Sequence, residues 1–233
     1  MSTLVNPASP GKIVARTASI HIDQVCNRFL NGCFKQFGIQ VVPLSGDAAA
    51  SFQRQKFEAC VLRLYDPEAE KILGALRNSN SNRAMVVYGV ARNAKEALRH
   101  SRYGINAVLD EPLDRAGVLK VVLATRSLVM NELRRYVRVP VVSEAVLESS
   151  AGRLPVMTLE VSSGGLSLRS RSLLPTNEPV KLGLELPGHD SVNLRAFICW
   201  GRAADKTYGL RFDTGDERRL KVRHWIDEFL ESA

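Results

Sequence analysis

Two hydrophobic patterns divide this chain near residue 134, and the change between them most constrains the fold. Before that point, five short apolar runs alternate with five segments whose apolar side chains recur at helical spacing. Because alternating strands and helices form βαβ units, this half predicts a parallel sheet with helices on both faces. We expect its strands at 12–19, 39–44, 59–65, 83–90 and 106–110.

The helices of this half are expected between and after those strands. The last one, at 114–133, is the longest, and its apolar positions suggest that two copies of the chain pair through it. The others are expected at 21–37, 46–55, 67–77 and 94–101.

After residue 134 the pattern changes to strands separated by Gly, Pro, Asn and Asp turns, which is typical of an antiparallel barrel. Residues 216–232 form an amphipathic helical pattern that places Leu220, Trp225, Ile226 and Phe229 against the barrel. The expected strand-like segments are 138–148, 154–170, 180–188, 193–203 and 206–213.

The fold class predicted is therefore a two-domain one, α/β followed by β. Residues 1–130 form the (βα)5 domain with a parallel sheet, and residues 131–233 form the antiparallel barrel with its terminal helix. A chain of 233 residues has the length of about two ordinary domains.

The charge is uneven between the halves. Residues 1–130 carry 17 Lys/Arg against 10 Asp/Glu, whereas residues 131–233 carry 15 against 14. The basic residues of the first half are scattered, and no helix-turn-helix, zinc or RNA-binding motif accompanies them, so nucleic acid is not expected as a partner. In the nearly neutral second half, the arginines of "LRRYVRVPV" (133–141) form a local cluster that suits a small anion.

Several classes of function are disfavoured by what the sequence lacks. It has no nucleophile–base–acid set, no phosphate-cradling P-loop and no histidine or cysteine spacing that binds metal, so we expect a non-catalytic protein without a cofactor. No apolar run is long enough to cross a bilayer and no secretory signal is present, which predicts a cytoplasmic protein without membrane insertion. The four cysteines are interpreted as small buried hydrophobic residues: Cys26, Cys33, Cys60 and Cys199.

The first half resembles a response-regulator receiver domain over residues 11–130. The resemblance is carried by the (βα)5 pattern and by "YGINAVLDEPLD" (103–114), which is similar to the fifth strand of a receiver and the turn after it. It implies two acids after the first strand that hold Mg²⁺ and an Asp after the third strand that accepts a phosphoryl group. A Thr or Ser after the fourth strand and a Lys before the following Pro complete the set.

This sequence departs from that set at every position, so the resemblance implies a pseudo-receiver that is not phosphorylated. Arg63 occupies the acceptor place, where its charge would repel a metal ion, and Glu111 replaces the Lys before Pro112. Asp66 becomes the acceptor only if the register slips by three residues. The other departures are Arg16, Thr17 and Ser19 after the first strand, with no acid before Asp23, and Gly89 near the Thr/Ser place.

The second half contains two paired motifs. Arg134 and Arg138 form RxxxR directly before "VPVVSEAVLE", and "LEVSSGGLSL" then supplies Glu160, Ser162 and Gly165 in a [DN]xSxxG pattern. With "YGLRF" near the end, residues 131–233 resemble the PilZ domain, a family that binds the bacterial second messenger cyclic di-GMP. The resemblance implies a binding site made of Arg134, Arg135, Arg138, Glu160, Ser162, Gly164 and Gly165.

The chemistry of these residues agrees with such a ligand. Guanidinium groups donate paired hydrogen bonds to phosphates and guanine edges and stack on purines. Ser162 offers a hydroxyl, while Gly164 and Gly165 allow close approach of ligand and backbone. Glu160 keeps the acceptor carboxylate of the family's Asp or Asn, but it is one methylene longer.

Two readings of function stay open at this point. In the first, the chain is a non-catalytic cyclic di-GMP receptor that acts on a downstream protein partner. In the second, it is an adaptor that no longer binds nucleotide, because "RRYVR" also fits a helix end and "SSGG" also fits a turn. Arg169 and Arg171 are expected to be exposed, and Trp200 is expected to serve in packing rather than in stacking on a base.

Overall fold

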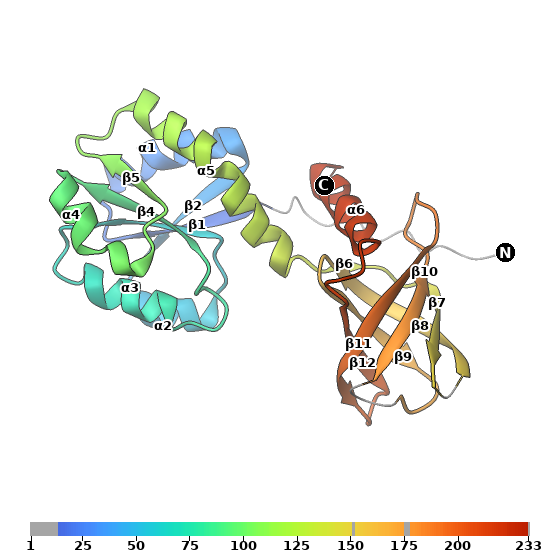
Figure 1. Ribbon diagram of the computed structural model, residues 1–233. Coiled ribbons are helices and arrows are strands. Elements are labelled where there is room, and N and C mark those ends of the chain that lie inside the picture. The colour runs from blue at the N-terminus through green and yellow to red at the C-terminus, as the bar shows by residue number, and fades with distance from the viewer. Residues whose placement is uncertain (1–13, 151, 175–177, 233) are drawn as a thin grey trace. The chain divides into compact units, whose positions relative to one another are not determined.

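The computed structural model describes residues 14–150, 152–174 and 178–232 (Figure 1). These residues form two compact units, one of residues 14–133 and one that begins at Arg134. Residues 12 and 13 of the first predicted strand lie outside the described residues. None of the described helices has both the length and the apolar content needed to cross a membrane.

The N-terminal unit is a five-stranded parallel sheet in the order β2-β1-β3-β4-β5. This is the order of flavodoxin-like doubly wound sheets, the group to which receiver domains belong. Figure 1 shows α1 and α5 on one face of the sheet, with α2 and α3 on the other. The strands are β1 (Ala15–Ile20), β2 (Ile39–Leu44), β3 (Ala59–Arg63), β4 (Val86–Ala91) and β5 (Ala107–Asp110).

The predicted helices are all present in this unit. The segment expected at 21–37 consists of α1 (Gln24–Phe34) followed by a 3₁₀ turn at Lys35–Phe37. Asp23 caps α1, because its carboxylate accepts a hydrogen bond from the backbone N–H of Cys26 at 2.9 Å. The remaining elements are α2 (Ala48–Arg54), α3 (Ala69–Arg77), α4 (Ala94–Arg99), the 3₁₀ turn Ser101–Tyr103 and α5 (Arg115–Tyr136).

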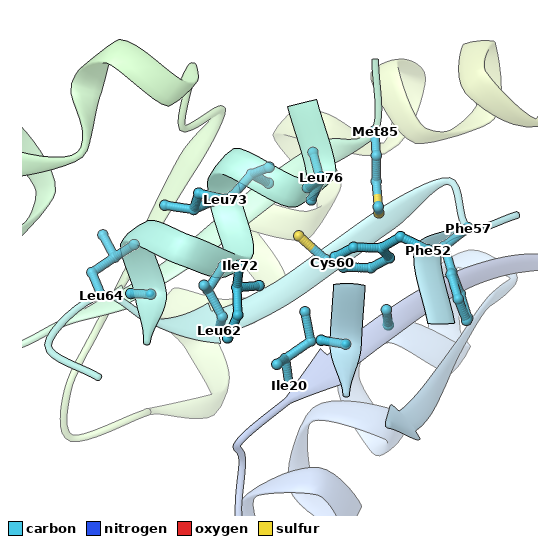
Figure 2. Close-up of a cluster of buried hydrophobic side chains, with 14 of the residues drawn as sticks. Ile20, Phe52, Phe57, Cys60, Leu62, Leu64, Ile72, Leu73, Leu76 and Met85 are labelled. Carbon is cyan, nitrogen blue, oxygen red and sulfur yellow. The ribbon is translucent and has the colours of Figure 1, made fainter. Parts of the chain in front are cut away.

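A hydrophobic core fills the space between the central strands and the helices α2 and α3 (Figure 2). Cys60 lies inside it, and burial raises the pKa of its thiol to about 12, so this cysteine is the small hydrophobic residue that the sequence predicts. Cys33 is also buried, but Cys26 is half-buried and Cys199 is exposed, which contradicts the prediction for those two. The largest core side chains include Ile20, Phe52, Phe57, Leu62, Leu73 and Leu76.

The long helix α5 ends three residues later than the expected 133. Asp114 caps its first turn by accepting from the N–H of Gly117 at 2.9 Å, and Val122 and Val129 are fully buried. Arg134 and Arg135 therefore belong to the last helical turn, whereas the sequence placed them in a segment before the barrel. Cations at this end are favoured because they complement the negative end of the helix dipole.

The C-terminal unit is an antiparallel barrel. Six strands run in the order β8-β7-β10-β11-β12-β9, and pairing of β9 with β8 closes the ring, while the short β6 pairs with β8 alone. Two predicted segments are each interrupted: irregular residues 141–143 divide 138–148 into β6 and β7, and a turn at 163–164 divides 154–170 into β8 and β9. The strands are β6 (Val139–Pro140), β7 (Glu144–Ser149), β8 (Gly152–Ser162), β9 (Gly165–Ser170), β10 (Pro179–Leu184), β11 (Val192–Arg202) and β12 (Thr207–Phe212).

The terminal helix α6 (Arg219–Ser232) packs near β8 and β11. Trp225 and Ile226 are buried as predicted, and the ring of Phe229 stacks on Trp225 with 5.9 Å between centroids. Leu220 is 49% exposed, so its predicted contact with the barrel is wrong, and Val222 is the residue buried there instead. At about 100° per residue, Leu220 lies on the opposite side of the helix from Val222.

Candidate functional site

Arg63, which the sequence pattern aligns with the phosphoryl acceptor of receivers, is held between two carboxylates. Arg63 ends β3, and its Nη2 atom lies 2.7 Å from Oδ2 of Asp23. Its Nε atom lies 3.6 Å from Oε1 of Glu111. The capped N–H of Cys26 and the Arg63 guanidinium hold the pKa of Asp23 well below its usual range. The acid that follows β1 therefore neutralises Arg63.

The neighbouring residues extend this network of charges. Arg92 lies 3.5 Å from Glu111 and stacks over the ring of Tyr65 at 3.6 Å. Asp66, the alternative acceptor, lies in the turn after β3 with its carboxylate 3.0 Å from Nδ1 of His21. Gly89 lies within β4, where the side chain of Leu64 packs against it. A Cβ at this position would collide with Leu64. Gly89 does not stand at the end of the strand, where the sequence placed it.

Replacing Arg63 with alanine is expected to lower the thermal unfolding midpoint near neutral pH. A carboxyl group with a depressed folded pKa stabilises the fold above its unfolded pKa, and this contribution is lost as the pH falls toward the folded pKa. The difference in unfolding midpoint between the variant and the unchanged chain should therefore shrink as the pH falls below 3.8, the ordinary pKa of an Asp side chain. Circular dichroism melts across this pH range measure it.

The matched control for that experiment is Arg28→Ala, which removes an exposed arginine from α1. This control should leave the midpoint and its pH dependence unchanged. Equal midpoints for Arg63→Ala and the unchanged chain at neutral pH would show that the network does not stabilise the unit.

In the barrel, a cavity of about 380 Å³ opens between the end of α5, the β8–β9 hairpin, β11 and β12. This volume lies within the range of small-molecule sites. Five of the seven predicted site residues line it: Arg135, Arg138, Ser162, Gly164 and Gly165.

The other two predicted residues, Arg134 and Glu160, do not line the cavity, but each takes part in an ion pair. Arg134 pairs through Nε with Asp227 of α6, and its backbone carbonyl accepts a hydrogen bond from Ser163 Oγ at 3.1 Å. Arg138 Nη1 lies 3.4 Å from Oε1 of Glu160. Each arginine of RxxxR therefore faces a carboxylate of the same unit.

The serine and second glycine of the ExSxxG segment also have a role in the fold. Ser162 Oγ donates to the carbonyl oxygen of Gly165 at 2.8 Å and so closes the β8–β9 turn. A Cβ on Gly165 would collide with the carbonyl oxygen of Leu210 in β12, whereas a Cβ on Gly164 would meet no atom within 4 Å. The close approach of the β12 backbone thus accounts for a glycine at position 165 even without a ligand. Gly164, by contrast, leaves free space beside it.

The remaining lining residues were not predicted as site residues. Trp200 of β11 is 45% exposed and lies across Gly209 of β12, where a Cβ would collide with the indole. Arg211 follows Gly209 two residues later on β12. The "YGLRF" segment contained both of these β12 residues, but their neighbour Trp200 comes from another strand. Ser163, Leu166, Cys199 and Leu210 complete the lining.

The lining residues favour a particular kind of ligand. Arg135, Arg138 and Arg211 supply three guanidinium groups, and the described residues that line the cavity include no Asp or Glu. Trp200 adds an exposed aromatic ring beside them. Such a wall suits an anion that also carries a flat ring system. Arg169 and Arg171 are exposed, as predicted, and do not line the cavity.

The C-terminal unit is thus a closed antiparallel barrel with an arginine-lined cavity. Residues 132–231 match the family model of the PilZ domain, which confirms the resemblance carried by the two motifs. The matched residues are those of the barrel and of α6. The match spans less than half of the chain and describes that unit alone. No curated protein matches the chain.

Solved structures similar to the chain cover its N-terminal half. A sensor protein from Polaromonas sp. JS666 is 20% identical over 51% of this chain and 98% of that chain, with a TM-score of 0.42. The receiver domain of a sensor histidine kinase from Pseudomonas aeruginosa PAO1 is 17% identical over 50% of this chain and 98% of that chain, with a TM-score of 0.42. Chemotaxis response regulator CheY4 of Vibrio cholerae is 13% identical over 49% of this chain and 99% of that chain, with a TM-score of 0.43. The fold of the N-terminal unit follows from its own strand order.

Proposed function

We propose that this chain is a non-catalytic receptor for cyclic di-GMP and binds it in the barrel cavity. The observation that carries the proposal is the grouping of three arginines and one exposed tryptophan around a cavity inside the region that the PilZ model matches. Two phosphodiesters need cations, and two guanines need stacking surfaces and polar partners at their edges.

Each cavity residue has a role in this proposal. Arg135, Arg138 and Arg211 donate to the phosphates and to the acceptor edge of guanine. Trp200 offers its exposed ring to a purine, which differs from the packing role expected from the sequence. Ser163 lines the cavity and its hydroxyl donates to the backbone carbonyl of Arg134, while Gly164 leaves room for the ligand.

Glu160 has a double role. Its carboxylate accepts hydrogen bonds from guanine N–H groups when the ligand is bound, and in the free protein it lies 3.4 Å from Arg138. The two side chains are exposed enough for this ion pair to be weak. Arg138 is therefore available to the ligand at little cost.

Calorimetric titration of the full chain with cyclic di-GMP tests the proposal, with GTP and the linear dinucleotide as controls. Saturable binding of the cyclic ligand alone is the expected result, because only that ligand presents both phosphodiesters and both guanines in one compact ring. Absence of heat and of any thermal shift at high ligand concentration would contradict it.

A second function, that of an adaptor without nucleotide, has one observation in its favour. Both arginines of RxxxR face carboxylates, Asp227 and Glu160, so the charges of these two arginines are balanced within the unit. This adaptor becomes the better account if the titration gives no binding.

The N-terminal unit has the same proposed role whether the chain is a receptor or an adaptor. We propose that it contacts a downstream protein partner in the cytoplasm without accepting a phosphoryl group; the resemblance implies Arg63 at the acceptor place, and two carboxylates hold its side chain. A homodimer through α5 is part of this proposal, because Leu123 and Leu128 are exposed on that helix.

A further inference from the structure

The C-terminal helix holds one of the two motif arginines. Asp227 of α6 forms an ion pair with Nε of Arg134, and the two side chains are only 25% (Arg134) and 28% (Asp227) exposed. The other motif pair, Arg138 with Glu160, is 56% and 39% exposed. An ion pair withdrawn from water is screened less, so the Arg134 pair is the stronger one.

The position of Asp227 is fixed by the packing of α6. Its neighbours Trp225 and Ile226 are buried, and the indole N–H of Trp225 donates to the carbonyl oxygen of Pro187 at 3.2 Å. The next residue, Glu228, lies 2.7 Å from Nε2 of His189, in the loop between β10 and β11. The carboxylate of Asp227 is thus presented to Arg134 by a helix that is anchored on both sides.

Arg134 also lies at the edge of the candidate ligand site. Its backbone carbonyl accepts from Ser163, whose side chain lines the cavity, and the next residue, Arg135, lines it as well. The carboxylate of Asp227 already neutralises part of the charge that Arg134 would offer to a phosphate. Asp227 and a bound phosphodiester therefore compete for Arg134.

We propose that Asp227 is an internal competitor of the ligand and that binding transfers Arg134 from α6 to a phosphate. This inference rests on the proposed function. Because coupling between two equilibria is reciprocal, α6 weakens ligand binding, and the ligand in turn weakens the docking of α6. The C-terminal helix is then the element that reports occupancy of the cavity.

The test compares Asp227→Asn with the unchanged chain in calorimetric titrations with cyclic di-GMP. The asparagine keeps the size of the side chain and removes its charge, so we expect affinity to rise about tenfold as the competing ion pair is lost. Glu228→Gln is the matched control, since it removes the adjacent charge on the same helix without touching Arg134, and it should leave affinity unchanged.

Amide hydrogen exchange of α6 gives a second measurement. In the unchanged chain, saturating ligand should speed exchange in residues 219–232, and in Asp227→Asn that exchange should already be fast without ligand. If the unchanged chain binds and Asp227→Asn binds equally tightly, with no ligand effect on α6, the competition is refuted while the proposed function stands. If neither protein binds the ligand, the proposed function itself is wrong.

Discussion

Arg138→Ala is expected to lower the affinity for cyclic di-GMP by about ten- to a hundredfold, since a hydrogen bond to a charged group contributes about 1.5–3 kcal/mol. The side chain lines the cavity and is more than half exposed in the free protein. Its removal should therefore leave the thermal unfolding midpoint nearly unchanged. Calorimetric titration beside a thermal melt separates the two effects.

Arg169→Ala is the matched control for Arg138→Ala. Arg169 is an exposed arginine on β9, in the hairpin that also carries the cavity glycines, but it does not line the cavity. Its removal should reduce affinity by no more than the general loss of one surface charge. Binding that survives both Arg138→Ala and Arg134→Ala would refute the site.

Gly165→Ala is expected to destabilise the barrel by about 3 kcal/mol, the upper end of ordinary overpacking. The added methyl group would collide with the carbonyl oxygen of Leu210, which belongs to the backbone of β12 and cannot turn aside. Both tryptophans of the chain, Trp200 and Trp225, lie in the C-terminal unit, so denaturant unfolding followed by tryptophan fluorescence reports on the barrel.

Gly164→Ala separates the fold from the cavity at the neighbouring position. A Cβ on Gly164 meets no atom within 4 Å, so the stability of the barrel should change by less than about 1 kcal/mol. Equal unfolding midpoints for Gly165→Ala and Gly164→Ala would mean that β9 and β12 can move apart more easily than their register indicates.

The sequence predicted the elements of both units because their patterns are local. Each parallel strand is an apolar run bounded by turn residues. The RxxxR and ExSxxG motifs predicted the barrel that contains them. The end of α5 was misplaced because the arginines before the barrel fit either a helix or a loop. The sequence marks the next element only at Val139, where β6 begins. The strand break inside 138–148 was missed because "VVS" (141–143) does not differ from an alternating strand, whereas the break inside 154–170 falls at "SSGG", which also fits a turn.

The candidate site was predicted only where its residues lie close together in the sequence. The arginine cluster and the "SSGG" turn each form a short segment. Trp200 and Arg211 are brought to the cavity by pairing of β11 with β12, and Asp227 is brought to Arg134 by the docking of α6. No spacing rule connects these positions to the motifs.

One helix belongs to both units. Val122 and Val129 of α5 are buried in the N-terminal unit, while Arg134 and Arg135 in the same continuous helix belong to the motif of the C-terminal unit. The chain therefore passes from one unit to the other inside a helix, with no loop between them.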